Sequence, residues 1–91
     1  MGPAETMRTT LAAWPQGYFT ADYDGRRYGV SNTSHAGGKS LKLYAEELGG
    51  TDIISLNLYT PSHGEPTLRP CEMPVEKVMA FIEGAAPVRE P

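Results

Sequence analysis

The chain has 91 residues, of which 40% are hydrophobic and 21% are charged, and its net charge is −3. This composition is typical of one globular domain and excludes a disordered tail or a repeat array. The negative charge argues against non-specific coating of DNA, which requires Lys and Arg side chains clustered over the phosphates. No apolar run approaches the roughly 18 residues that span a bilayer, so we expect no association with a membrane.

A domain of this size buries only about two thirds of the surface of its unfolded chain. We therefore expect an added element, a bound partner or a homodimer interface to stabilise it. The single cysteine, Cys71, has no second cysteine with which to form an internal disulfide. A lone thiol and a start without a signal-like apolar stretch both predict a cytoplasmic location.

The two ends of the chain show little periodicity. Residues 1–17 are predicted to form a loosely ordered arm, in which TTLAAW makes one helical turn capped by Thr10 and ended by Pro15. Leu11 and Trp14 are its expected anchors. Residues 85–91, AAPVREP, are predicted to be a disordered tail because they are proline-rich and charged. A single domain then extends over residues 18–84.

This domain begins with a predicted hairpin, YFTADYDGRRYGVS, in which Asp24-Gly25 separates two alternating stretches. The turn of a two-residue hairpin needs positive φ, which Gly adopts without steric cost. Closing the turn with Tyr23 and Arg26 gathers the apolar side chains on one face, and this consistency supports the register. The side chains on that face are Phe19, Ala21, Tyr28 and Val30.

The next segment, HAGGKS, resembles the end of a phosphate-binding P-loop. The P-loop pattern GxxxxGK[ST] needs a glycine five positions before Gly38, but Thr33 stands there. The motif is therefore incomplete, and Gly37-Gly38 is interpreted as a second hairpin turn.

Residues 39–48 fit two structures. Leu41, Tyr44, Ala45 and Leu48 have the spacing of a short helix, whereas Leu41, Leu43 and Ala45 alternate as in a strand. We expect a strand over residues 39–45 that runs into a helical turn at residues 46–48, because a lone two-turn helix is marginal. The helix remains the alternative.

The last third of the chain predicts two strands and a helix. TDIISLNLYT is a strand with Ile54, Leu56 and Leu58 inward, and PTLRP is a short edge strand because its prolines lack N–H donors. MPVEKVMAFIEG is an amphipathic helix, started at Pro74 and ended at Gly84, with the apolar stripe Val75, Val78, Met79 and Ile82. The predicted fold is α+β: an antiparallel meander of about five strands with one C-terminal helix packed on one face, in two layers.

Few residues have the identity and spacing of a catalytic or metal-binding site. His35 and His63 lie in predicted turns, and with Cys71 they show no metal-ligand spacing, so no metal or cofactor is expected. Asp22, Asp24 and Asp52 lie beside turns and are interpreted as turn and solubility residues. A reactive Cys71 thiol near the start of the helix is the least favoured functional hypothesis, because free cysteines are mostly buried and inert.

The outer face of the predicted sheet is more informative. Alternation places aromatic rings there among cationic and amide side chains, which is typical of a surface for single-stranded nucleic acid. The candidate residues are Arg27, Lys42, Tyr44, Asn57, Tyr59 and Arg69, with Tyr18, Thr20, Ser31, Thr33 and Ser55 on the same face. The alternative interpretation is ordinary strand surface or a dimer interface, since strands favour Tyr and Thr on any exposed face.

The order of the elements resembles a known family. A meander whose last hairpin ends in GEPTLRPCEMP, followed by the helix PVEKVMAFIEG, is similar to the single-stranded-DNA-binding core of the transcriptional positive cofactor four family. The resemblance covers roughly residues 27–84 and concerns topology, not a specific motif. It implies single-stranded DNA binding and a dimeric sheet, whereas the acidic composition and the Gly-Gly pairs depart from the family.

Two functional hypotheses follow from these observations. The first is a small non-enzymatic binding or interaction domain that associates with itself or with an unknown protein partner. The second is single-stranded nucleic-acid binding through the outer face of the sheet.

Overall fold

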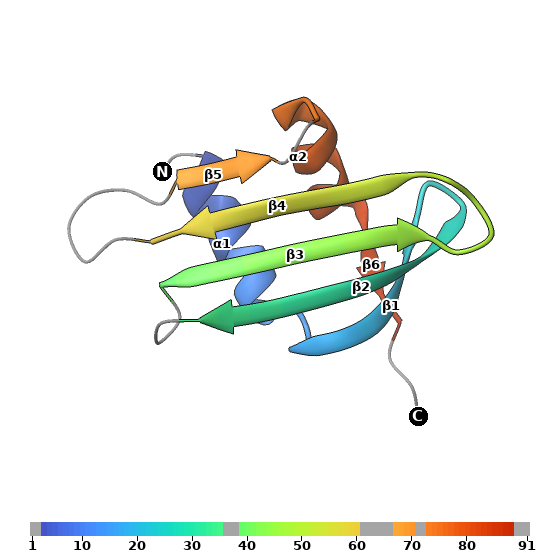
Figure 1. Cartoon of the computed structure of the whole chain (residues 1–91), viewed down its shortest axis with the longest axis horizontal. Coiled ribbons are helices and arrows are strands. Elements are labelled where there is room, and N and C mark those ends of the chain that lie inside the picture. Colours follow the sequence, from blue (N-terminus) through green and yellow to red (C-terminus); the bar gives the residue numbers. More distant parts are fainter. Residues whose placement is uncertain (1–2, 36–38, 61–66, 71–72, 89–91) are drawn as a thin grey trace.

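A computed structural model describes residues 3–35, 39–60, 67–70 and 73–88 of the chain. Six strands form one antiparallel sheet in the order β5-β4-β3-β2-β1-β6. The elements, in chain order, are α1 (Pro3–Ala13), β1 (Gly17–Tyr23), β2 (Arg26–His35), β3 (Ser40–Glu47), β4 (Ile53–Tyr59), β5 (Thr67–Pro70), α2 (Val75–Gly84) and β6 (Ala86–Pro87) (Figure 1).

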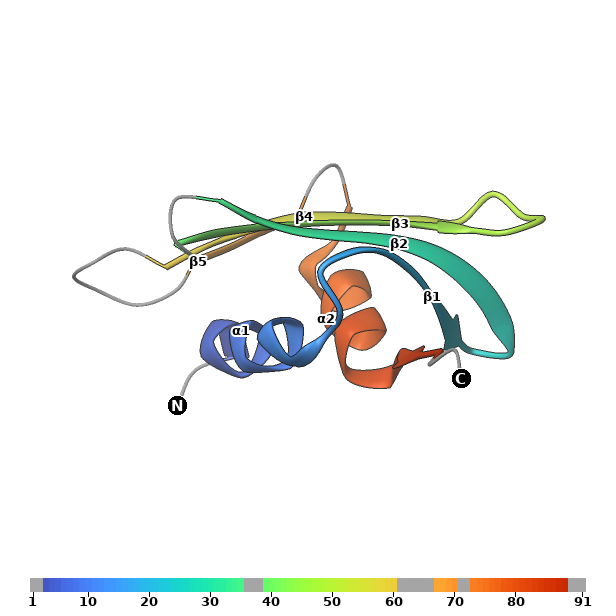
Figure 2. The ribbon, with the colours of Figure 1, turned by 90° about the horizontal axis from the view of Figure 1, so that it is seen from below.

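The fold has two layers, because both helices cover the same face of the sheet (Figure 2). Strands β1 to β5 form the expected meander, so the predicted α+β class with an antiparallel sheet is confirmed. The structure also contains a second helix, α1, and a sixth strand, β6, which the predicted fold lacked. The face opposite the helices carries no other described element, and we call it the outer face.

The first hairpin has the predicted register. Tyr23 pairs with Arg26, and the turn residues Asp24 and Gly25 have φ values of 53° and 75°. Positive φ at both turn positions matches the right-handed twist of the strands. All the apolar residues expected on the inner face of this hairpin are buried in the core.

The segment from residue 39 onward is a strand, as preferred, but its second part differs from the prediction. β3 continues to Glu47, which pairs with Tyr28 of β2, and there is no helical turn at residues 46–48. Strand neighbours on both sides pair with the backbone here, which outweighs the weak helical spacing. β4 and the edge strand β5 lie where they were expected, with Ile54, Leu56 and Leu58 buried.

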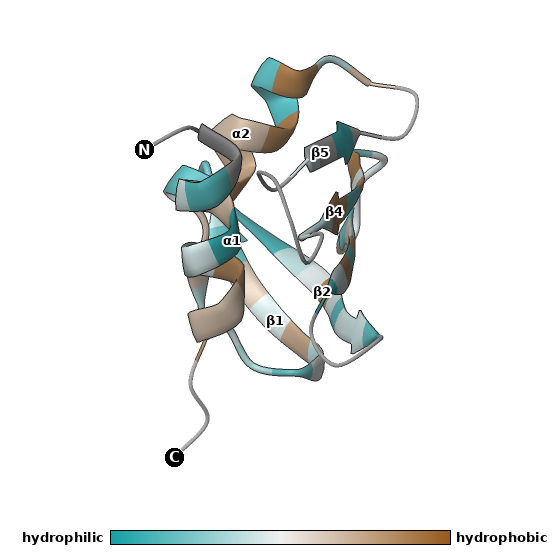
Figure 3. Ribbon diagram, turned by 90° about the vertical axis from the view of Figure 1, so that its left-hand side faces the viewer, coloured by the Kyte–Doolittle hydropathy of each residue, from teal (hydrophilic) through white to brown (hydrophobic). Residues whose placement is uncertain are grey.

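Both ends of the chain are more ordered than predicted. The arm contains helix α1, which buries Met7 and Leu11, and Trp14 is buried directly after the helix ends. The apolar stripe of α1 is narrow, and polar residues, coloured teal in Figure 3, surround it. A helix of this length forms mainly through tertiary contacts. The expected anchors Leu11 and Trp14 are confirmed, whereas Thr10 lies within the helix.

The predicted disordered tail is also wrong for its first part. Ala86–Pro87 form β6 beside β1, and the Val88 N–H donates to the Thr20 carbonyl over 2.8 Å. Pro87 fits in a strand because its nitrogen faces away from β1. Residues 89–91 lie outside the described part of the chain.

Helix α2 begins at Val75, directly after the extended Pro74. It buries Val78, Phe81 and Ile82, whereas Val75 is 39% exposed. Val75 was therefore wrongly placed in the buried stripe, because the first turn extends past the edge of the core. Phe81 was missed, since a periodic stripe does not show how far a ring reaches toward neighbouring elements.

Phe81 is the centre of an aromatic cluster. Its ring centroid lies 5.1 Å from that of Tyr23, 5.2 Å from that of Tyr28 and 6.2 Å from that of Trp14. The rings meet edge to face, a favoured geometry that contributes about 0.5–1.5 kcal/mol per pair beyond burial. The cluster joins α2 to β1, to β2 and to the segment after α1.

Among the described residues, Asn32 is the polar side chain that is fully buried. Its Nδ2 donates to the carbonyls of Leu11 and Pro15, each over 3.2 Å. Carbonyls at the end of a helix lack donors within the helix, so Asn32 attaches the end of α1 to β2.

Replacing Asn32 with Ala should lower the free energy of unfolding by about 1–3 kcal/mol, because the Pro15 carbonyl loses its side-chain donor. Urea unfolding followed by Trp14 fluorescence measures this loss, with an unchanged m-value as the sign of comparable states. The control is Ser31→Ala, on the opposite face of β2, which should change stability by less than about 0.5 kcal/mol. Equal stability of the two variants would show that these hydrogen bonds do not hold α1.

Candidate functional site

The outer face displays most of the predicted binding residues in one small area. Lys42 of β3 pairs with Asn57 of β4, which pairs with Arg69 of β5. Residues paired across strands share a face, so these three side chains form one row. We call it the basic row.

Two tyrosines lie on either side of the basic row. Tyr44 is two residues from Lys42 along β3, and Tyr59 is two residues from Asn57 along β4 in the opposite direction. Each tyrosine is therefore about 7 Å from the row along its strand. Tyr44 is 39% exposed and Tyr59 is 44% exposed, so both rings are open to a ligand. Lys42 and Arg69 are also exposed.

Arg27, the sixth predicted residue, is not part of this group. It pairs with Asp22 at the opposite end of the sheet, and its Nε lies 2.6 Å from an Asp22 carboxylate oxygen. Arg27 lies on the predicted face, but away from the other five candidate residues. Alternation assigns a residue to a face, but it does not give its position along that face.

Charge is unevenly distributed over the outer face. The half near the β2–β3 hairpin holds Lys42, Arg69 and His35, and none of the described residues on that half of the face is acidic. The acidic residues Glu46 and Asp22 lie toward the other end. Glu46 is four residues from Lys42 along β3, about 13 Å away. The half of the outer face near the β2–β3 hairpin is therefore locally cationic, although the net charge of the whole chain is −3.

Tyr18 is a further exposed aromatic residue on this face, and it was left out of the predicted site. At 68% exposure it is the most open of the large hydrophobic side chains in the described residues. Its ring lies over Gly29, where an added Cβ would be 2.5 Å from the Tyr18 hydroxyl oxygen. Because Gly29 has no side chain, the Tyr18 ring can lie directly against the backbone of β2. The strand alternation was the signal that could have added Tyr18.

A second polar cluster lies at the end of the sheet near α2. The Tyr28 hydroxyl donates to Asp52 over 2.7 Å, and the Lys77 ammonium lies 2.6 Å from the other Asp52 oxygen. Lys77 and Tyr28 hold the pKa of Asp52 below its ordinary value. Burial and the bond to Asp52 raise the pKa of Tyr28 to about 12.

These pKa shifts keep Asp52 charged and Tyr28 protonated near neutral pH, so neither group is suited to proton transfer there. The cluster instead attaches the β3–β4 turn to α2. The sequence indicated that Asp52 is a turn and solubility residue, but its contacts with Tyr28 and Lys77 give it a structural role as well. It was missed because its partners Tyr28 and Lys77 are distant in the sequence.

From the sequence we expect no metal site, and a reactive Cys71 is the least favoured hypothesis. No group of three or more His, Cys, Asp or Glu side chains in the described residues could hold a metal ion. Cys71, His63 and the predicted hairpin turn at Gly37-Gly38 lie outside the described residues, and the pairing of β2 with β3 is described as far as His35 and Ser40. Among the described helices, none is both long and apolar enough to cross a membrane.

Comparisons of this chain with protein-family models, with curated proteins and with solved structures found no match.

The pH dependence of stability tests the role of Asp52. Because its pKa is lowered in the folded state, Asp52 stabilises the fold above its ordinary pKa of 3.8, and this contribution is lost as pH falls through the folded value. Asp52→Asn should therefore be less stable than the wild type near neutral pH, with the difference shrinking in acid. Urea unfolding at a series of pH values measures both proteins.

Lys77→Met is the matched variant for this experiment, because Lys77 is the main cause of the lowered pKa. It should remove most of the same pH dependence while Asp52 stays in place. Parallel stability profiles for the wild type and Asp52→Asn would contradict the proposed role.

Proposed function

We propose that this protein is a non-enzymatic binding domain that binds single-stranded nucleic acid on the outer face of its sheet. The observation that carries the proposal is the basic row, Lys42, Asn57 and Arg69, between the exposed rings of Tyr44 and Tyr59.

The spacing of these groups suits an extended strand of nucleotides. Two strand spacings, about 10 Å, separate Lys42 from Arg69 across the sheet. A phosphate backbone that follows the basic row would meet a cation at each end and the Asn57 amide between them. Bases on either side of the backbone would then stack on Tyr44 and Tyr59, and each stacked base contributes about 1–3 kcal/mol.

A single strand fits this face better than a duplex does. Reading a duplex requires a helix or a two-stranded ribbon that enters a groove. The basic row lies on the outer face of the sheet, and both helices cover the other face (Figure 2). The overall negative charge also disfavours long contacts with duplex phosphates. A locally cationic area with open rings needs only a few nucleotides.

The single-stranded ligand agrees with the one implied by the resemblance in topology. A cytoplasmic location, expected from the sequence, suits this ligand.

Binding should depend on the tyrosines and cations of this area. With a labelled mixed-sequence single-stranded oligonucleotide, Tyr44→Ala and Tyr59→Ala should each weaken binding by about 5- to 150-fold through lost stacking. Lys42→Ala and Arg69→Ala should each reduce the slope of log K against log salt by about 0.7. Fluorescence anisotropy over a range of salt concentrations measures both effects.

Arg27→Ala is the control, because Arg27 is exposed on the same face but paired with Asp22 away from the basic row. It should leave both affinity and salt slope unchanged. The absence of binding at low salt would refute the proposal, as would equal losses in Arg27→Ala and Lys42→Ala.

A further inference from the structure

Tyr18 extends the set of exposed rings on the outer face. Tyr18 of β1 pairs with Ser31 of β2, which pairs with Tyr44 of β3, so the two tyrosines belong to one row across the sheet. Two strand spacings, about 10 Å, separate them, with the small Ser31 side chain between. A single strand that stacks a base on Tyr44 therefore meets a further ring when it continues along this row.

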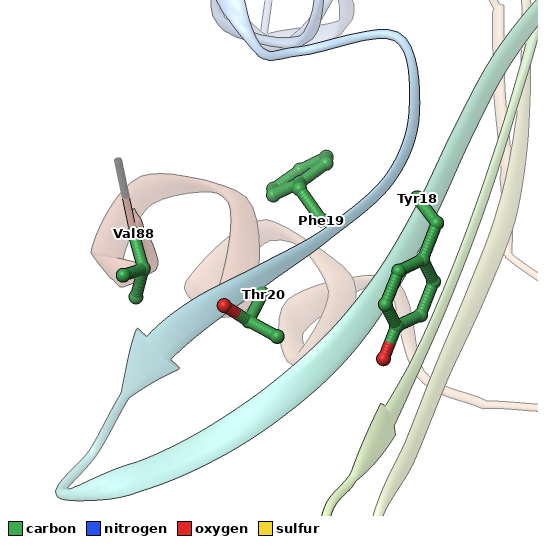
Figure 4. A pocket seen from close by; sticks show the side chains of 4 residues that line it. All are labelled: Tyr18, Phe19, Thr20 and Val88. Atoms are coloured by element: carbon green, nitrogen blue, oxygen red, sulfur yellow. The ribbon is translucent and has the colours of Figure 1, made fainter. Parts of the chain in front are cut away.

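Gly29 determines where the Tyr18 ring lies. Figure 4, which shows the pocket lined by Tyr18, Phe19, Thr20 and Val88, places the ring on the side of β1 opposite Phe19. A Cβ added at Gly29 would be 2.5 Å from the Tyr18 hydroxyl oxygen, so the hydroxyl end of the ring lies over this glycine. Tyr18 is nevertheless 68% exposed. The ring thus rests against β2 while most of its surface stays open to a base.

A carboxylate lies beside the hydroxyl end of this ring. Glu46 of β3 pairs directly with Gly29, and Cβ positions of directly paired residues are about 4.5–5.5 Å apart. Because the Tyr18 hydroxyl occupies the space over Gly29, Glu46 is its neighbour on the outer face. Glu46 is exposed, and within the described part of the chain no hydrogen bond or ion pair engages its carboxylate.

The charges around Glu46 leave this carboxylate available to a ligand. Arg27, two residues from Gly29 along β2, has its Nε 2.6 Å from an Asp22 carboxylate oxygen. Lys42 is four residues away along β3, about 13 Å. A carboxylate only accepts hydrogen bonds, so Glu46 favours a ligand group that donates them.

We propose that the single strand stacks a further base on Tyr18 and that Glu46 selects this base, favouring an amino-bearing base such as cytosine over thymine. This inference rests on the proposed function and adds a base preference to it. The N4 amino group of cytosine donates to a carboxylate, whereas thymine has the acceptor O4 in that position. Stacking on a ring tolerates every base, so the preference arises from Glu46.

The probes are two single-stranded oligonucleotides of equal length, about ten nucleotides, one of deoxycytidine and one of thymidine. Fluorescence anisotropy at neutral pH should show that the wild type binds the cytosine probe at least about fivefold more tightly. The two probes carry the same charge and the same size of ring. Contacts of the basic row with phosphates therefore do not produce the difference.

Glu46→Gln is the variant that tests selection, because the glutamine amide keeps the shape of the side chain but both donates and accepts hydrogen bonds. Its affinities for the two probes should lie within about twofold of each other. Asp22→Asn is the matched control, since it also removes a carboxylate from the outer face, but one that is bound to Arg27. It should keep the cytosine preference of the wild type.

Gly29→Ala tests the position of the Tyr18 ring. Gly29 lacks the positive φ that would strain an alanine, and the added methyl group would overlap with the Tyr18 hydroxyl, so the ring has to move. Affinity for the cytosine probe should fall at least about fivefold through lost stacking, and the preference over thymine should shrink. Urea unfolding checks that the variant remains folded.

The outcomes separate this inference from the proposed function. Equal affinity of the wild type for the two probes would overturn the inference and leave single-stranded binding standing, whereas binding of neither probe at low salt would refute both. A cytosine preference that persists in Glu46→Gln, or that Asp22→Asn loses to the same extent, would show that another group selects the base. Unchanged binding of the cytosine probe by Gly29→Ala would exclude Tyr18 as its stacking partner.

Discussion

The contact of Phe81 with three other aromatic rings is the interaction on which the rest of the structure depends. Neither α1 nor α2 is long enough to be stable alone in water, so both need the sheet, and the sheet needs them to cover its apolar face. Phe81 meets Trp14, which follows α1, and Tyr23 and Tyr28 of the first hairpin. Because this cluster holds both helices on the inner face, the outer face remains open.

Two polar attachments complement the aromatic cluster. Asn32 attaches the end of α1 to β2, and Asp52 joins the β3–β4 turn to α2 through Tyr28 and Lys77. Apolar burial has no preferred direction, whereas a hydrogen bond requires a defined distance and angle. These side chains therefore set the positions of the helices that the aromatic cluster holds against the sheet.

The outer face is the surface of the sheet that the helices leave open (Figure 2). It presents side chains, with the basic row between the exposed rings of Tyr44 and Tyr59. Tyr18 adds a further exposed ring to this face, where it lies over Gly29.

The sequence by itself determined the features that depend on local rules. Asp24-Gly25 specified the first hairpin, strict alternation specified Ile54, Leu56 and Leu58 as buried, and alternation also assigned the predicted binding residues to the outer face. Only the tertiary structure decided that residues 3–13 are a helix, that residues 86–87 join the sheet, and that Arg27 lies apart from the basic row. The physical reason is that these features depend on partners distant in the sequence: α1 on the sheet and α2, β6 on β1, and Arg27 on its position along β2. Local periodicity shows which face a side chain occupies, but only packing and strand register show what it meets there.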